Sequence, residues 1–159
     1  MDKFMNSESI RIADQLRRAF NGEAWHGPSV REVLEGVTAA GASARPLAGA
    51  HSIWELAVHI EAWVRAPLEA TDGVAMPWPI PVEMDWPPVG EGSSAWTEAK
   101  GRLFAAAEQF AKTVETFSAA RLRETVPGRD FDFYFLFHGV VQHSLYHAGQ
   151  IAMLKKALP

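Results

Sequence analysis

The amino-acid sequence predicts an all-α fold, a four-helix bundle with one long crossover connection rich in proline and tryptophan. Apolar residues recur at helical spacing in four long segments, and residues 72–92, between the second and third segments, contain five prolines. Amphipathic helices bury their apolar stripes by packing against one another, which makes a bundle the simplest arrangement. The 159 residues have the length of one domain, so we expect a single bundle over residues 1–159.

The first part of the chain predicts a long helix, a short helix and a loop. The long helix should end near Asn21-Gly22, and the short helix should follow Pro28-Ser29. Residues 41–50 are mostly small and include Pro46, which indicates a loop. The apolar stripe of the first helix comprises Phe4, Ile10, Ala13, Leu16, Ala19 and Phe20.

The second long helix should run from about His51 to Leu68. Ser52 and Glu55 have the spacing of a capping box, in which each side chain accepts a hydrogen bond from the other residue's backbone N–H. Pro67 should end or kink this helix, because proline has no N–H and its ring clashes with the preceding turn. The apolar stripe comprises Ile53, Leu56, Ala57, Ile60, Val64 and Leu68.

Residues 72–92 should form an extended crossover, because prolines at that density exclude a continuous helix. We expect this strap to be ordered and packed across the bundle, near the open end of a site. Trp78 and Trp86 would supply large contact areas there. In the alternative interpretation the two tryptophans only cover the core.

The last two long helices follow the strap. Helical spacing returns from Ser94 to about Ala120, and Pro127-Gly128 then breaks the chain. A final helix should run from about Phe133 to Leu158, which completes the set of four.

Composition and charge argue against several classes of function. The net charge of −4 offers no general attraction to nucleic-acid phosphates, so we expect no nucleic-acid partner. The chain has no cysteine, which excludes disulfides and fits a reducing compartment. No signal-peptide core is visible, and no apolar run approaches the roughly 20 residues that span a bilayer. We therefore expect a cytoplasmic protein with no membrane partner.

Three histidines are candidates for a metal site. His143 and His147 lie one turn apart in the middle of the apolar stripe of the last helix, and His59 lies at the shoulder of the stripe of the second. Burial of a polar ring without a partner costs about 1–3 kcal/mol, so something inside the bundle should satisfy these rings. Three converging neutral imidazoles could hold a divalent metal and leave it open positions. A hydrogen-bonded histidine core would need no metal.

Glu55 lies one turn from His59 on the same side of the helix. It could be a fourth ligand, an acceptor for an imidazole N–H or a general base, and the helix cap alone would also explain it. The remaining histidines are weaker candidates. They are His138, on the opposite face of the last helix, His51, at a helix start, and His26, in a turn.

Four motifs occur in order along the chain: GEAWHGPS at 22–29, HSIWELAVHIEAW at 51–63, DWPPVGEGSSAW at 85–96 and HSLYHAGQI at 143–151. This ordered set resembles the DinB-like superfamily of metal-binding four-helix bundles, also called YfiT-like metal-dependent hydrolases. The resemblance places the family's three metal-binding histidines at His59, His143 and His147. It implies a divalent ion, nickel or zinc above all, a bundle with crossed-over connectivity, and a homodimer.

The resemblance also implies an enzyme that acts on a small molecule, as a thiol-dependent S-transferase or isomerase or as a hydrolase. Because the chain has no cysteine, any thiolate would have to come from a low-molecular-weight cosubstrate. Two other classes stay open, a non-enzymatic protein that binds a metal or small ligand, and a structural dimer with a polar histidine core. Candidates for orienting a ligand are Glu55 and Gln150, and candidates for the pocket wall are Trp63, Trp78, Trp86 and Gln150. For Gln150 the alternative is a tight helix contact at Ala148-Gly149.

Overall fold

A computed structural model describes residues 7–159, and each regular element within that range is a helix. The predicted all-α fold is confirmed. Phe4, which the predicted first helix included, lies outside the described residues. The elements are α1 (Ser7–Asn21), α2 (Val30–Leu34), α3 (Ala39–Ser43), α4 (Ile53–Thr71), α5 (Val82–Asp85), α6 (Gly92–Thr116), the 3-10 helix η1 (Ala119–Arg123) and α7 (Phe133–Lys156).

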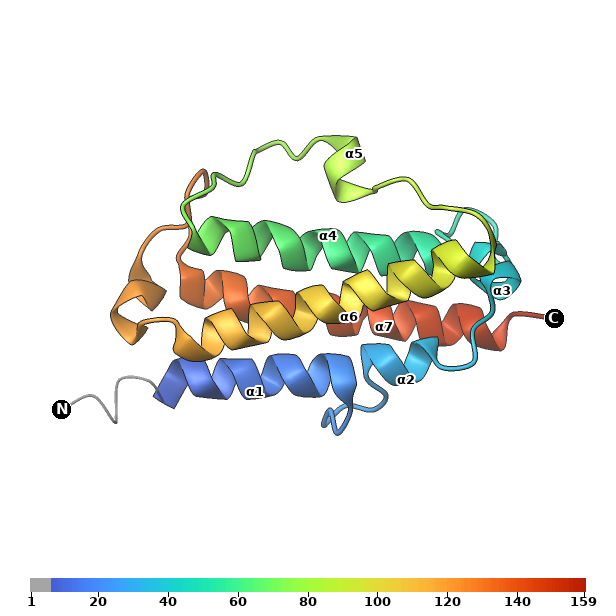
Figure 1. Cartoon of the computed structure of the whole chain (residues 1–159), viewed down its shortest axis with the longest axis horizontal. Coiled ribbons are helices and arrows are strands. Elements are labelled where there is room, and N and C mark those ends of the chain that lie inside the picture. The colour runs from blue at the N-terminus through green and yellow to red at the C-terminus, as the bar shows by residue number, and fades with distance from the viewer. Residues whose placement is uncertain (1–6) are drawn as a thin grey trace.

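The four long helices α1, α4, α6 and α7 form the bundle (Figure 1). α6 packs against α1 and α4, and α7 packs against the same two helices. α4 and α6 run in the same direction, because the chain returns along the whole length of α4 before α6 begins (Figure 1). This returning segment is the predicted crossover. It places the short helix α5 against the outer side of α4 (Figure 1).

Side-chain caps fix where the helices that carry the site begin. The capping box predicted for α4 is confirmed, since Ser52 Oγ accepts from Glu55 N–H at 3.2 Å and the Glu55 carboxylate accepts from Ser52 N–H at 2.7 Å. At the start of α7, Asp132 accepts from Phe135 N–H at 2.9 Å. Caps of this kind satisfy N–H groups that a helix leaves unpaired, and each contributes about 1 kcal/mol.

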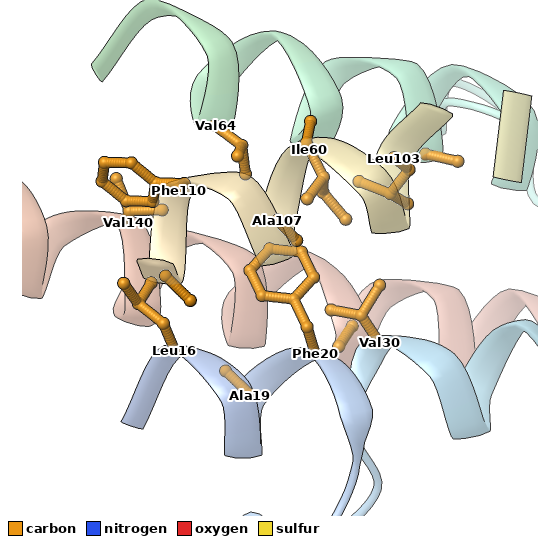
Figure 2. Packing of buried hydrophobic residues seen from close by; sticks show 14 of the residues in the cluster. Leu16, Ala19, Phe20, Val30, Ile60, Val64, Leu103, Ala107, Phe110 and Val140 are labelled. Carbon is orange, nitrogen blue, oxygen red and sulfur yellow. The ribbon is translucent and has the colours of Figure 1, made fainter. Parts of the chain in front are cut away.

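The core is filled by the facing apolar stripes of the four long helices (Figure 2). Phe20, Ile60 and Phe110 are each at most 1% exposed. The stripe predicted for α1 is wrong at Ile10, which is 48% exposed, whereas Ile12 is buried. Two positions correspond to about 200° around a helix, so the two side chains point to opposite sides.

Several predicted boundaries are wrong by a few residues. α4 continues through Pro67 to Thr71 instead of ending at Leu68, because a proline removes only one helical hydrogen bond and the following Ala70 and Thr71 are buried in the bundle. α3 starts at Ala39 and extends into the predicted loop, with Thr38 as its N-cap. The third long helix runs over Gly92–Thr116, and η1 replaces its expected last turn.

The strap is extended as predicted, except for the single turn α5. This turn follows Pro81, and proline is tolerated at a helix start, where its missing N–H would have no partner in any case. Within residues 7–159, no helix is long and apolar enough to cross a membrane. The cytoplasmic location stays a prediction.

Candidate metal centre

α4 and α7 bring His59, His143 and His147 together inside the bundle. His59 comes from the middle of α4, and the other two share one face of α7 because they are four residues apart. One ring nitrogen of each can be chosen so that all three lie within 4.8 Å of one another. His59 is 5% exposed and His147 7%, whereas His143 is only partly buried, so the cluster lies at the edge of the packed core.

The three rings face one another through their Nε2 atoms. His59 Nε2 and His147 Nε2 lie 3.0 and 3.1 Å from His143 Nε2, respectively. Two imidazole nitrogens bound to one zinc ion at about 2.0–2.1 Å are separated by about 2.9–3.4 Å. The spacing therefore fits ligands of a shared ion, and it also fits hydrogen bonds between the rings.

Oxygen acceptors orient two of the three rings. His59 Nδ1 lies 2.6 Å from the backbone oxygen of Asp85, and His147 Nδ1 lies 2.5 Å from Gln150 Oε1. Because these oxygens only accept, each Nδ1 carries the ring hydrogen, and each neutral ring presents an Nε2 lone pair to the centre. Metal-binding histidines usually make such an outer hydrogen bond, which fixes both tautomer and orientation.

Which ring nitrogen of His143 carries the hydrogen distinguishes a metal site from a hydrogen-bonded core. Its Nδ1 is buried and has no hydrogen-bond partner in the described part of the chain. With the hydrogen on Nε2, His143 would share it between the lone pairs of His59 and His147. With the hydrogen on Nδ1, three lone pairs converge, and a cation is needed to satisfy them. Three imidazole donors fit zinc and nickel.

The environment keeps the three rings neutral near pH 7. Burial, together with the neighbouring His147 and His59, lowers the pKa of His143 to about 3. Burial also lowers the pKa of His59 and that of His147, although the hydrogen bonds to Asp85 and Gln150 oppose the shift. A metal therefore meets rings that need not lose a proton before binding.

These pKa shifts predict how the metal-free protein responds to pH. The unfolded chain takes up protons on these histidines near pH 6.5, whereas the folded rings resist protonation. The free energy of unfolding should therefore fall as the pH drops below about 6.5, and these rings should not change it above that pH. Urea denaturation at several pH values measures the slope, and ¹⁵N shifts of the rings report their protonation. A His143 ring that titrates near pH 6.5 would contradict the buried cluster.

The strap forms the outer wall of the cluster. The indole of Trp86 stacks on His59, with ring centroids 3.9 Å apart and an interplanar angle of 10°, and it also stacks on His51 at 3.6 Å and 9°. The Asp85 carboxylate accepts from Trp63 Nε1–H at 2.7 Å and lies 3.4 Å from His59 Nδ1. The strap thus contacts the candidate site directly, rather than only covering the core.

The predicted pocket residues do not all lie at the cluster. Trp63 lies beside His143, with ring centroids 5.4 Å apart. Trp86 stacks on His59, and Gln150 forms a hydrogen bond with His147. Trp78 is instead 74% exposed and lines a separate surface hollow. Of the tight helix contact considered at Ala148-Gly149, Ala148 is buried at 1% exposed, whereas a Cβ built at Gly149 would meet no atom within 4 Å.

Glu55 is occupied by the cap. Its carboxylate also pairs with Arg45 at 2.5 Å, and His51 Nδ1 lies 3.5 Å away. Burial alone would raise the pKa of Glu55, but the Ser52 N–H and the Arg45 charge outweigh it and hold the pKa below its ordinary value. These contacts favour the capping role, and the general-base role of Glu55 stays a prediction.

Sequence reasoning missed Asp85 and His51. Asp85 opens one of the family-like motifs, and its position directly before Trp86 was the available signal. The turn α5 that directs Asp85 toward His59 has no periodic pattern by which it could be recognised. His51 precedes the N-cap of α4, and its stacking on Trp86 joins residues 35 positions apart in the chain.

The comparisons with known proteins give one match. A family model described as the DinB superfamily matches residues 24–151, a range that contains the three histidines, the strap and most of the bundle. No curated protein and no solved structure matches the chain. Since the family model covers well over half of the 159 residues, the chain belongs to the DinB superfamily.

Proposed function

We propose that the protein is a metal-dependent enzyme that acts on a small molecule. His59, His143 and His147 would hold one divalent ion, and their three imidazole donors favour nickel or zinc. The observation that carries the proposal is the convergence of three Nε2 atoms, two of which are kept as lone pairs by oxygen acceptors. Membership of the DinB superfamily supports the same role.

Three protein ligands leave open positions on a divalent ion, which would supply the Lewis acidity that makes water or a thiol nucleophilic near neutral pH. The chain's own residues orient and shield the centre. Asp85 and Gln150 hold His59 and His147 in place, and Trp86 covers the His59 ring. The Asp85 carboxylate lies on the Nδ1 side of His59 and accepts from Trp63 Nε1–H, so it orients the outer wall of the centre rather than facing the converging Nε2 atoms.

Two reaction classes fit this arrangement, thiol-dependent transfer and hydrolysis. The chain has no cysteine, so the transferase reaction needs a low-molecular-weight thiol as cosubstrate. The hydrolase needs only water.

Metal analysis of protein purified without an affinity tag tests the proposal. We expect about one nickel or zinc ion per chain, because the cluster offers one set of three converging nitrogens. In cobalt-substituted protein, a new thiolate-to-metal absorption band after addition of glutathione or cysteine would support the transferase. Ester or amide hydrolysis without thiol would support the hydrolase. Failure to bind any divalent ion, as purified and after reconstitution, would contradict both.

Two alternatives predict different results. A non-enzymatic binding protein would hold the metal without turnover of any substrate. A structural histidine core would bind no metal and would show its hydrogen on His143 Nε2. The homodimer stays a prediction. Phe135, Tyr146 and Met153 on α7 are 63–66% exposed and could contribute apolar surface to it.

A further inference from the structure

A cavity of about 210 Å³ opens beside the histidine cluster. It lies between α4, α7 and the turn that precedes α7, and the His143 ring forms part of its wall. A molecule bound there would therefore contact the ring of His143, one of the three candidate ligands. Most of the remaining wall is apolar and is formed by Trp63, Phe131, Phe135, Leu136 and Val140.

Arg129 is the one charged side chain in the wall of this cavity. It donates from Nη1 to the backbone oxygen of Pro77 at 3.2 Å, and its guanidinium lies 5.2 Å from the ring centroid of Phe131 and 4.5 Å from that of Trp78. Its contacts in the described part of the chain are thus a backbone oxygen and two aromatic rings. The two rings hold the planar guanidinium where this cavity meets the neighbouring hollow, which Trp78 and Asp130 also line, and neither ring neutralises its positive charge.

The chemistry of this wall selects a class of ligand. A guanidinium carries five N–H donors in a rigid fork, and one hydrogen bond to Pro77 leaves enough of them for both oxygens of a carboxylate. The apolar wall favours a ligand with a hydrocarbon or aromatic body. A phosphate dianion would be poorly matched, because the wall offers a single cation and is otherwise mostly apolar.

We infer that the substrate is a small organic carboxylate, with its apolar body in this cavity, its carboxylate on Arg129 and its reacting end against His143. This inference rests on the proposed function, because it assigns the substrate class of the same centre. Arg129 is then a residue that determines specificity, and it is separate from the metal ligands.

Gly139 allows the cavity to be filled without disturbing the fold. It lies within α7 in the cavity wall, and a Cβ built there meets no atom within 4 Å. A side chain at this position should also favour the helix, since glycine is the weaker helix former. Gly149 has the same open surroundings on α7 but lines a different hollow, beside Gln150. Gly139→Leu and Gly149→Leu are therefore a matched pair.

The test is binding of phenylacetate to the full-length chain, measured by calorimetry and by quenching of tryptophan fluorescence. The protein is first treated with a chelator, so that the carboxylate cannot bind a metal, and the measurement is repeated after addition of zinc. Phenylacetamide, which is neutral, and phenyl phosphate serve as comparison probes. Circular dichroism confirms that each variant is folded.

Phenylacetate should bind metal-free protein at least tenfold more tightly than phenylacetamide or phenyl phosphate does. Arg129→Gln should weaken its binding about tenfold to a hundredfold, because a charge-assisted pair is lost, and Arg129→Lys should restore part of it. Arg11→Gln changes the net charge equally at an exposed site on α1 and should have no effect. Gly139→Leu should abolish binding, and Gly149→Leu should not.

Equal binding of phenylacetate and phenylacetamide would overturn the inference, as would unchanged binding by Arg129→Gln or by Gly139→Leu. Preference for phenyl phosphate would also overturn it. These failures are separable from failure of the proposed function. A chain that holds metal through the three histidines but does not bind phenylacetate retains the metal centre and loses the assigned substrate class. A chain that binds phenylacetate through Arg129 but takes up no metal retains the carboxylate site and loses the proposed enzyme.

Discussion

Replacement of His147 by alanine should remove the bound metal, and any activity with it, while leaving the helical fold largely intact. His147 contributes one of three Nε2 atoms that meet in the interior. Loss of an outer hydrogen-bond partner already costs a metal site about tenfold to a hundredfold in affinity, so loss of a ligand should cost more than a hundredfold. Metal titration with a competing chelator measures this change.

The fold should survive this substitution because the bundle is held by its apolar stripes. Alanine is the best helix former, so α7 should persist. Loss of the ring leaves a cavity, and the free energy of unfolding should fall by about 2–4 kcal/mol at most. Circular dichroism and urea denaturation, carried out on the metal-free protein, separate this cost from the loss of metal binding.

His138→Ala is the matched control for His147→Ala. His138 is also on α7, but it lies beside Tyr134, with ring centroids 4.5 Å apart, and its Nε2 is 3.9 Å from Glu8. Its substitution should leave metal affinity unchanged. Full metal affinity in His147→Ala would rule out the three-histidine site, and global unfolding of the metal-free variant would show that His147 is needed for the fold itself.

The helices could be predicted from the sequence because each long helix needs one apolar stripe, and that requirement is local. The apolar stripes also predicted the site, because His143 and His147 occupy positions within the stripe of α7, where a polar ring needs a partner. His59 could be added because it lies at the edge of another stripe. The structure brings these three rings together.

The outer wall of the site could not be predicted, because its contacts join residues that no local pattern connects. The orientation of Asp85 depends on a single helical turn between prolines, and the stacking of Trp86 on His51 and His59 depends on how the strap crosses α4. Trp78 shows the same limitation. It also lies next to proline in the strap, as Trp86 does, yet it is exposed beside Arg129 and lines a hollow that includes none of the three histidines.

Phe110→Ala should lower the free energy of unfolding by about 3–5 kcal/mol, which is a large part of the 5–15 kcal/mol typical of a domain. Phe110 is fully buried on α6 and lies next to Val140 of α7 in Figure 2, and its ring packs edge-on against Phe137 of α7 with centroids 5.5 Å apart. Truncation removes its contacts and leaves a cavity between two long helices. Urea denaturation with and without added zinc measures the change.

The two denaturation series also test whether the metal or the core holds the bundle together. Zinc should stabilise the wild type and Phe110→Ala by the same amount, because the histidines lie on α4 and α7 and do not include the truncated ring. Phe110→Leu should lose less, since leucine fills much of the space. If Phe110→Ala cost less than about 1 kcal/mol without metal, this ring would not be tightly packed. The metal-free bundle would then need another source of stability, because a close-packed core cannot lose a buried aromatic ring at so small a cost.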